Sequence, residues 1–547
     1  MSDSPPSSRS SSSAWLIRQW RDGRSIALWP LGLIMGVIAG YAALGLILAI
    51  EVTSFLVFGA DHEQLVTGIA RLPAWHVMLA PVGGGIVVAA LLYVGHKRGW
   101  LPEARAGGIA DVMEARAARG GKITVANGLI STLISSISLG SGGSAGREGP
   151  AVHLGAALAS LMARLLGLPP RGVKILLACG AAAAVAASFN APVAGALFAF
   201  EIVLGHYALR SIAPVAIASV TGALISRAHL GVAPAFSMPA LSPASLLDLP
   251  GVVVLGLLSA LVAAAFIRST VFVPRWVGQQ ADRMKFPLWA LPPIGGVLIG
   301  MLALIAPEIL GVGYEATATA LAGGYTITIL LLLVLLKLAA TAITLGFRFG
   351  GGVFSPSLYL GAMLGAAFGG ALALTGWETA GVPFYAVVGM GAVAGAALGA
   401  PLSTTLIVFE LTASYEASVA VLIAVSLATV LSQSLAGGSV FHLQVLRRGY
   451  DLSRGQARVL LQTIRVRDIM SEMTPEEAGA DTDKDAACLY EDDYLGRAIG
   501  FLSAEGIDGT VVRSRSGDQP IVGYISRTDA HAAYAKALAD AHEEEHR

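Results

Sequence analysis

Long stretches of apolar residues without charge recur along the first four fifths of the chain. Examples cover residues 123–146, 175–200, 316–336, 350–377 and 379–409. A helix that crosses the hydrocarbon core of a bilayer needs about 20 apolar residues, and several stretches reach that length. Others are interrupted by glycine or proline, which membrane helices tolerate only where protein or a water-filled cavity covers the freed backbone groups. The pattern predicts a polytopic membrane protein with interrupted helices.

Polar character is concentrated near the C-terminal end. Of the 72 Asp, Glu, Lys and Arg residues, 32 lie in residues 447–547. Charged residues make up only 13% of the chain, against about a quarter in soluble proteins. Basic and acidic residues balance at 36 each, so charge gives no reason to expect nucleic acid as a partner. These observations exclude a soluble enzyme and predict a large membrane domain followed by a small soluble tail.

The charge distribution divides the chain into four predicted parts. We expect a disordered cytoplasmic segment over residues 1–26, a membrane domain over 27–446, a linker over 447–465 and a small α/β domain over 466–540. Arg18, Arg21 and Arg24 precede the first apolar stretch, and this basic flank favours a cytoplasmic N-terminus. Two cysteines, Cys179 and Cys488, are too few for a disulfide framework or a metal site.

Two motifs recur in the same order and at nearly the same offset. Residues 146–156 and 352–362 both read G-x-x-x-P-x-x-x-L-G-A, 206 positions apart. The second motif is Ala-Pro followed by a glutamate nine residues after the proline. It occurs at Pro192 and Glu201 and again, 209 positions later, at Pro401 and Glu410. Close helix packing explains glycines, but not prolines and glutamates in register. We infer that the membrane domain is duplicated, with repeats over roughly residues 27–245 and 246–446. Such duplication is typical of transporters whose binding site lies between the repeats. The sequence does not decide whether the two repeats are parallel or inverted.

Each copy of the first motif is a glycine-rich loop that leads into a helix start, at residues 140–150 and 350–356. Backbone N–H groups at a helix N-terminus bind anions. Two such loops meeting inside the bilayer would form an anion site without a full positive charge. The chain has no Gly-Lys-Ser/Thr of a phosphate-binding loop, and a loose dinucleotide pattern at residues 140–145 lacks the required strand–helix context.

Glu148 is the principal functional candidate, because an ionisable side chain at membrane depth marks a functional site by default. Its carboxylate would occupy the anion site when charged and leave it when protonated. The alternative is a structural ion pair with adjacent Arg147, although neighbouring positions on a helix do not face each other. We expect Glu201 and Glu410 to hold helix ends, and His153 to be packed or hydrogen-bonded.

With these motifs the sequence resembles the CLC family of chloride channels and chloride/proton exchangers over roughly residues 28–450. The resemblance rests on G-R-E-G-P at 146–150, G-G-V-F-S-P-S at 351–357 and the two Ala-Pro…Phe-Glu segments. It implies an all-α inverted-repeat fold of about eighteen tilted, partly broken helices. It also implies a homodimer in a bacterial inner membrane, with both termini in the cytoplasm. Glu148 would be the gating glutamate, and the anion would lie against Arg147, Gly149, Gly352, Val353 and Phe354.

The sequence departs from the family at three places. Gly107, Gly108 and Ile109 align with the family's first anion-binding loop, and Gly107 replaces a serine whose hydroxyl binds the ion. Phe441 stands where the family has a tyrosine hydroxyl. A hydrogen bond to an ion is worth about 1.5–3 kcal/mol, so we expect weaker central anion binding. Ile202 replaces a second glutamate that family exchangers often carry, which favours a channel without deciding between passive and proton-coupled flux.

The tail resembles one degenerate cystathionine-β-synthase-type (CBS) motif. A β-like stretch at 509–513 and another at 520–525 precede Ser526, Asp529 and an alanine-rich helix. In such modules this aspartate holds the ribose of an adenine nucleotide. Because these motifs usually work in pairs, the single copy favours a role in stabilising a dimer over nucleotide sensing.

The sequence therefore predicts transport of chloride or a similar small monovalent anion, controlled by protonation of Glu148. Chloride, protons and the lipid bilayer are the expected partners, and we expect no cofactor, metal or enzymatic activity. One alternative is a membrane-embedded sensor with a vestigial pore and a signalling tail. Another is a membrane hydrolase built on Ser141, Ser144 and His153, but nothing in the sequence orients a base there.

Overall fold

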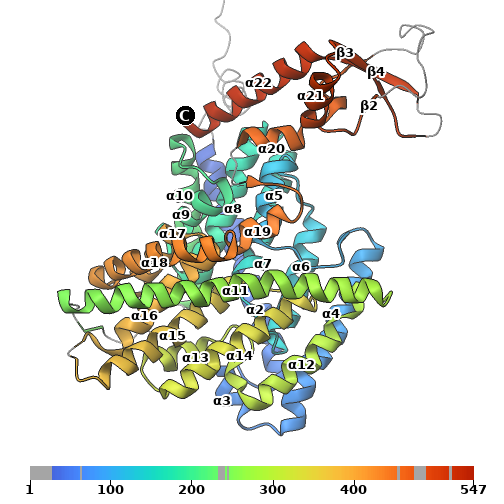
Figure 1. Ribbon diagram of the computed structural model, residues 1–547. Helices are drawn as coiled ribbons and strands as arrows, with labels where there is room; N and C mark the ends of the chain where they lie inside the picture. Colours follow the sequence, from blue (N-terminus) through green and yellow to red (C-terminus); the bar gives the residue numbers. More distant parts are fainter. Residues whose placement is uncertain are drawn as a thin grey trace, which may run out of the picture. The chain divides into compact units, whose positions relative to one another are not determined.

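The computed structural model describes residues 28–61, 64–231, 241–242, 245–377, 379–452, 456–472, 488–516 and 520–546 (Figure 1). The expected N-terminal segment with Arg18, Arg21 and Arg24 lies outside these residues. Residues 453–455 of the expected linker and 473–487 of the expected tail domain do so as well. The chain forms two compact units: a membrane unit with Gly120–Gln444 and the residues up to Arg116, and a tail unit with Ala117–Arg119 and the residues from Val445.

Eighteen α-helices, α2 to α19, account for most of the described residues between 28 and 446. Ten helical segments in the described part of the chain are long and apolar enough to cross a membrane, which confirms the predicted polytopic helical fold. The helices are α2 Leu28–Phe58, α3 Leu65–Ile69, α4 Ala74–Lys97, α5 Ile109–Ala118, α6 Val125–Gly140, α7 Glu148–Leu165, α8 Pro170–Phe189, α9 Pro192–Phe198, α10 Leu209–Leu230, α11 Leu249–Arg283, α12 Pro292–Ile305, α13 Tyr314–Leu321, α14 Ile327–Gly346, α15 Phe354–Ala373, α16 Gly381–Leu398, α17 Pro401–Thr412, α18 Tyr415–Ala436 and α19 Val440–Leu446.

The two halves of the membrane unit repeat the same packing. α2 packs on α10 and α8, and its counterpart α11, the long helix in Figure 1, packs on α18 and α16. Counterparts also contact each other directly, because α4 packs on α12 and α9 packs on α17. The duplicated sequence thus folds into two halves that pack alike and that contact each other through equivalent helices.

Glycines let counterpart helix pairs approach closely. A Cβ atom on Gly155 of α7 would lie 2.5 Å from the carbonyl oxygen of Gly180 in α8. In the second half, a Cβ atom on Gly361 of α15 would lie 2.2 Å from the carbonyl oxygen of Gly389 in α16. Any side chain at these positions would push the helices apart, and small residues are the usual basis of tight packing between membrane helices.

The two Ala-Pro motifs start new helices inside the membrane unit, and the first of these, α9, is completed by the second half of the chain. The carboxylate of Glu410 in α17 accepts hydrogen bonds from the N–H groups of Val193 (2.9 Å) and Ala194 (2.8 Å). These are among the N–H groups that a helix start leaves without an intrahelical partner. Glu410 therefore caps α9, as we expected of this glutamate.

The reverse contact completes α17. The carboxylate of Glu201, in a π-helical turn that continues α9, accepts hydrogen bonds from the N–H groups of Leu402 (3.2 Å) and Ser403 (2.9 Å). The hydroxyl of Ser403 donates to the same carboxylate at 2.5 Å. Each half thus supplies the acceptor for the broken helix of the other half, and the helix-end role predicted for Glu201 is confirmed.

The tail unit has a small four-stranded sheet with the order β1-β4-β3-β2, in which β2 and β3 are parallel and the other pairs antiparallel. Its core contains Leu489, Leu495, Leu502, Val512 and Ile525. The elements are α20 Gln456–Thr463, β1 Ser471–Glu472, β2 Leu489–Tyr490, α21 Leu495–Ala504, β3 Gly509–Arg513, β4 Ile521–Ser526 and α22 Arg527–His546.

Asp529 lies in the first turn of α22, where it closes a reciprocal cap with Ser526. The hydroxyl of Ser526 donates to Oδ2 of Asp529 at 2.7 Å, and the N–H of Asp529 donates to the oxygen of Ser526 at 2.9 Å. These bonds give both residues a structural role at the helix start. The identification of the tail as a CBS motif and the nucleotide contact at Asp529 stay predictions.

Replacing Glu410 with alanine should lower the free energy of unfolding by about 0.5–2 kcal/mol, because two N–H groups at the start of α9 lose their acceptor. Glu201→Ala should have an effect of similar size through α17. Thermal unfolding of the purified protein in detergent would measure both changes. Asp282→Ala, which removes an exposed carboxylate of α11, is the control; equal stability of all three variants would contradict the capping role.

Candidate functional site

The two glycine-rich loops meet inside the membrane unit and pair with each other. The N–H of Gly146 donates to the carbonyl oxygen of Gly352 at 2.7 Å, and the N–H of Gly352 donates to the carbonyl oxygen of Gly146 at 2.6 Å. This antiparallel bridge joins equivalent residues of the two halves. A Cβ atom on Gly146 would lie 2.6 Å from Oε2 of Glu148, and one on Gly352 would lie 3.0 Å from the nitrogen of Gly149. Glycine is therefore required for the helix starts of α7 and α15 to come together.

A third helix start lies beside these two. The loop before α5 contains Ala106, whose Cβ would be 3.4 Å from a Cβ atom added to Gly350. In the same loop, a Cβ atom on Gly107 would lie 2.3 Å from Nε2 of His153, which belongs to the second turn of α7. The N-terminal ends of α5, α7 and α15 thus converge, and each contributes the positive end of a helix dipole.

Glu148 is the first residue of α7, and its side chain is fully buried between the two paired loops. Oε1 accepts a hydrogen bond of 2.5 Å from the hydroxyl of Ser355, the second residue of α15. Oε2 is buried and has no hydrogen-bond partner among the residues that the structure describes. The carboxylate is thus tethered to one helix start and bonded to the other. It occupies the place where the helix dipoles favour a negative charge.

The guanidinium of Arg147 makes its contacts with other residues. It donates to the carbonyl oxygen of Ser188 at 3.2 Å and lies 4.9 Å from the centre of the Tyr314 ring. Within the described residues, Arg147 and Glu148 form no ion pair. The structure therefore does not support the alternative of a structural ion pair between Arg147 and Glu148.

Some backbone N–H groups that we expected to bind an anion already have acceptors. The N–H of Gly107 donates to the hydroxyl of Ser131 and that of Gly108 to Oδ2 of Asp111, both at 2.8 Å. The N–H of Gly352 is used in the bridge between the loops. Helix starts lack intrahelical acceptors, so the remaining candidates lie in the first turns. They are Ile109, Gly149, Val353 and Phe354, for which binding of an anion stays a prediction.

Two aromatic side chains belong to the predicted site. The ring of Phe354 is fully buried and packs against those of Phe189 and Phe198, with ring centres 5.0 and 5.9 Å away. This packing fixes the start of α15. Phe441, the second residue of α19, is also buried. Its position beside an anion stays a prediction.

The sequence analysis did not identify Lys337, a fully buried cation in α14. Its ammonium donates to the carbonyl oxygens of Ile309 and Gly311, each at 2.9 Å, and lies 4.9 Å from the centre of the Tyr359 ring. These bonds hold the turn that leads into α13, whose first residue, Tyr314, stacks on Arg147. A lone charge inside an apolar stretch was the available signal.

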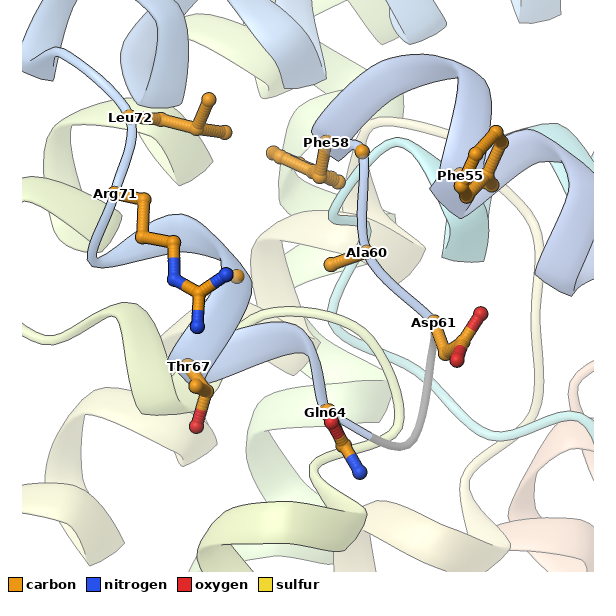
Figure 2. Close-up of a pocket in the computed structure, with 10 residues that line it drawn as sticks. Phe55, Phe58, Ala60, Asp61, Gln64, Thr67, Arg71 and Leu72 are labelled. Atoms are coloured by element: carbon orange, nitrogen blue, oxygen red, sulfur yellow. The ribbon is translucent and has the colours of Figure 1, made fainter.

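A cavity of about 440 Å³ lies where α2 ends and α3 begins (Figure 2). Figure 2 shows the guanidinium of Arg71 directed toward this space. Glu315 of α13 holds α3 by accepting hydrogen bonds from the N–H groups of Val66 (2.8 Å) and Thr67 (3.1 Å). None of the predicted site residues lines this cavity. In the described part of the chain, no group of three or more His, Cys, Asp or Glu side chains could hold a metal ion.

Known proteins resemble the chain over most of its length. A family model described as voltage gated chloride channel matches residues 84–433. A ClcB-like chloride channel protein of Ralstonia nicotianae is 32% identical over 401 residues, which cover 72% of this chain and 91% of that protein. The voltage-gated ClC-type chloride channel ClcB of Escherichia coli O81 is 30% identical over 412 residues, or 75% of this chain and 96% of that protein. The crystal structure of a slow cyanobacterial Cl⁻/H⁺ antiporter shares the fold, with a TM-score of 0.67 and 23% sequence identity. The match covers 77% of this chain and 97% of the antiporter chain.

The ring of His153 leaves no room for a side chain at position 107. His153 is buried and bonded to Asn127 at 2.9 Å, so its ring has little freedom to move aside. Gly107→Ala should therefore lower the free energy of unfolding by about 1–3 kcal/mol. In a His153→Ala background the same change should cost much less, because the space is free. Thermal unfolding of the four proteins measures this coupling; strictly additive effects would contradict it.

Proposed function

This chain belongs to the voltage-gated chloride channel family, and from that premise we propose that it moves chloride or a similar small monovalent anion across the membrane, with the carboxyl group of Glu148 as the gate. The observation that carries this proposal is the position of that carboxylate, buried between two converging helix starts and bonded to Ser355. A carboxylate and a chloride ion need the same donors, so they compete for the site. Protonation removes the negative charge of Glu148 and lets the anion enter.

The site would bind its anion mainly through backbone N–H groups. Gly107 has no side chain, and Phe441 has no hydroxyl. A hydrogen bond to an ion contributes about 1.5–3 kcal/mol, so the loss of two hydroxyl donors lowers the affinity for a central ion. Weak binding suits rapid release, because conduction requires an ion to leave as readily as it enters.

Proton-coupled exchange is the second candidate function. A buried carboxyl group that leaves and re-enters the anion path can carry a proton, which favours this reading. At the position where family exchangers often carry a second glutamate, Ile202 is apolar, and the carboxylate of the neighbouring Glu201 is engaged in capping α17. We therefore place passive flux first.

We also propose a homodimer in a bacterial inner membrane, with both termini in the cytoplasm, as the family resemblance implies. The family is one of channels and transporters rather than enzymes, and the alternative of a sensor with a vestigial pore has no support.

Glu148→Gln should raise chloride flux at neutral pH to at least the level that the wild type reaches in acid, because the neutral amide cannot compete as an anion. The variant should also lose the dependence of flux on pH. Chloride efflux from liposomes, recorded over a series of pH values, measures both effects. Glu416→Gln, at an exposed glutamate of α18, should behave as wild type. Unchanged flux and pH response in Glu148→Gln would count against the gate.

Proton movement separates the two candidate functions. Under a chloride gradient across liposomes, passive flux moves no protons against their gradient, and the reversal potential follows chloride alone. Recording internal pH with the membrane potential clamped would test this expectation. Uphill proton movement in the wild type that disappears in Glu148→Gln would establish exchange instead.

A further inference from the structure

Another cavity lies at the end of the membrane unit where the α5–α6 loop faces the α7–α8 loop. Its volume is about 820 Å³, within the range of roughly 300–1,000 Å³ that is usual for small-ligand sites. Lys122, Ile123 and Thr124 line it from the first loop. Arg164 and Leu168 line it from the end of α7 and the second loop. It shares no lining residue with the site around Glu148.

The walls of this cavity are fixed by bonds between the loops and the helices. The N–H of Ile123 donates to the hydroxyl of Ser160 in α7 at 3.1 Å. The N–H of Leu168 donates to the carbonyl oxygen of Ala163 at 3.0 Å. The cavity is therefore formed before any ligand arrives, which lowers the entropy that binding must overcome.

The cavity is lined by two basic side chains and by no acidic one. Lys122 and Arg164 are exposed, and neither side chain forms an ion pair or a hydrogen bond within the described part of the chain. These two charges favour an anionic ligand, and basic loops are typical of the cytoplasmic side of a membrane protein.

Apolar surface continues directly from these charges. Leu165 and Leu166, next to Arg164, are 75% and 39% exposed, and Ile123, Leu168 and Val173 line the cavity itself. Exposed leucines beside basic residues place this region at the boundary between headgroups and acyl chains. A free phosphate would use the charges but not the apolar walls.

We propose that this cavity binds an anionic phospholipid, with the phosphate between Lys122 and Arg164 and the start of an acyl chain against Leu168 and Val173. Basic pockets between membrane helices bind anionic headgroups in this way. The lipid would act as a fixed part of the membrane unit and is independent of the proposed transport function.

Native mass spectrometry of the whole protein, titrated with phosphatidylglycerol or phosphatidylcholine, tests the proposal. We expect phosphatidylglycerol to bind more tightly. The double variant Lys122→Ala/Arg164→Ala should lower its apparent affinity about thirtyfold, from the contribution that each basic residue makes near an anionic headgroup. Lys122→Arg/Arg164→Lys should keep most of the affinity, because both charges remain.

The matched control is Arg275→Ala/Arg283→Ala, which removes two exposed basic residues of α11 and should leave phosphatidylglycerol binding unchanged. Equal binding of the two lipids by the wild type would overturn the proposal, and so would equal losses in the two alanine variants. Competition by inorganic phosphate or glycerol 1-phosphate at the concentration of the lipid would overturn it as well, since it would show that the charges alone bind the ligand.

Discussion

Unpaired backbone N–H groups are costly inside an apolar environment, and the structure around Glu148 follows from that constraint. The Gly146–Gly352 bridge satisfies one N–H group from each loop and brings the remaining helix starts together. Those N–H groups create a local preference for negative charge. The carboxylate of Glu148 meets this preference, with Ser355 as its donor. In the proposed function, the gating carboxyl group and the transported anion therefore use the same set of donors.

The cations near this centre are kept out of it. Arg147 donates to a backbone carbonyl and stacks on Tyr314, while Lys337 donates to two carbonyls of the turn before α13. Both side chains thus brace the turn that begins α13, and carbonyl dipoles and aromatic rings partly offset the cost of burying them. A direct ion pair with Glu148 would instead hold the carboxylate in place, which conflicts with the proposed gating role.

Much of this arrangement could be predicted from the sequence, because duplication fixes the register of the two halves and an isolated glutamate in an apolar stretch stands out. The hydrogen-bond partners of the site residues could not be predicted in the same way. Ser355 is an unremarkable residue of its motif, and its bond to Glu148 depends on a contact across 207 positions. The N–H groups of Gly107 and Gly108 donate hydrogen bonds to Ser131 and Asp111, and the glycine pattern does not predict these bonds. Lys337 stands out as the single charge in residues 316–347, but its bonds to Ile309 and Gly311 could not be predicted from that position.

The exchange of glutamate caps between α9 and α17 has a consequence for the ancestry of the fold. A chain of half the length would leave the start of its broken helix without an acceptor in lipid, so it would need a second copy to supply the glutamate. In the duplicated chain the two copies are joined, and each always has the other beside it. Glu201 and Glu410 each serve the other repeat, so a change at either glutamate acts on the opposite half.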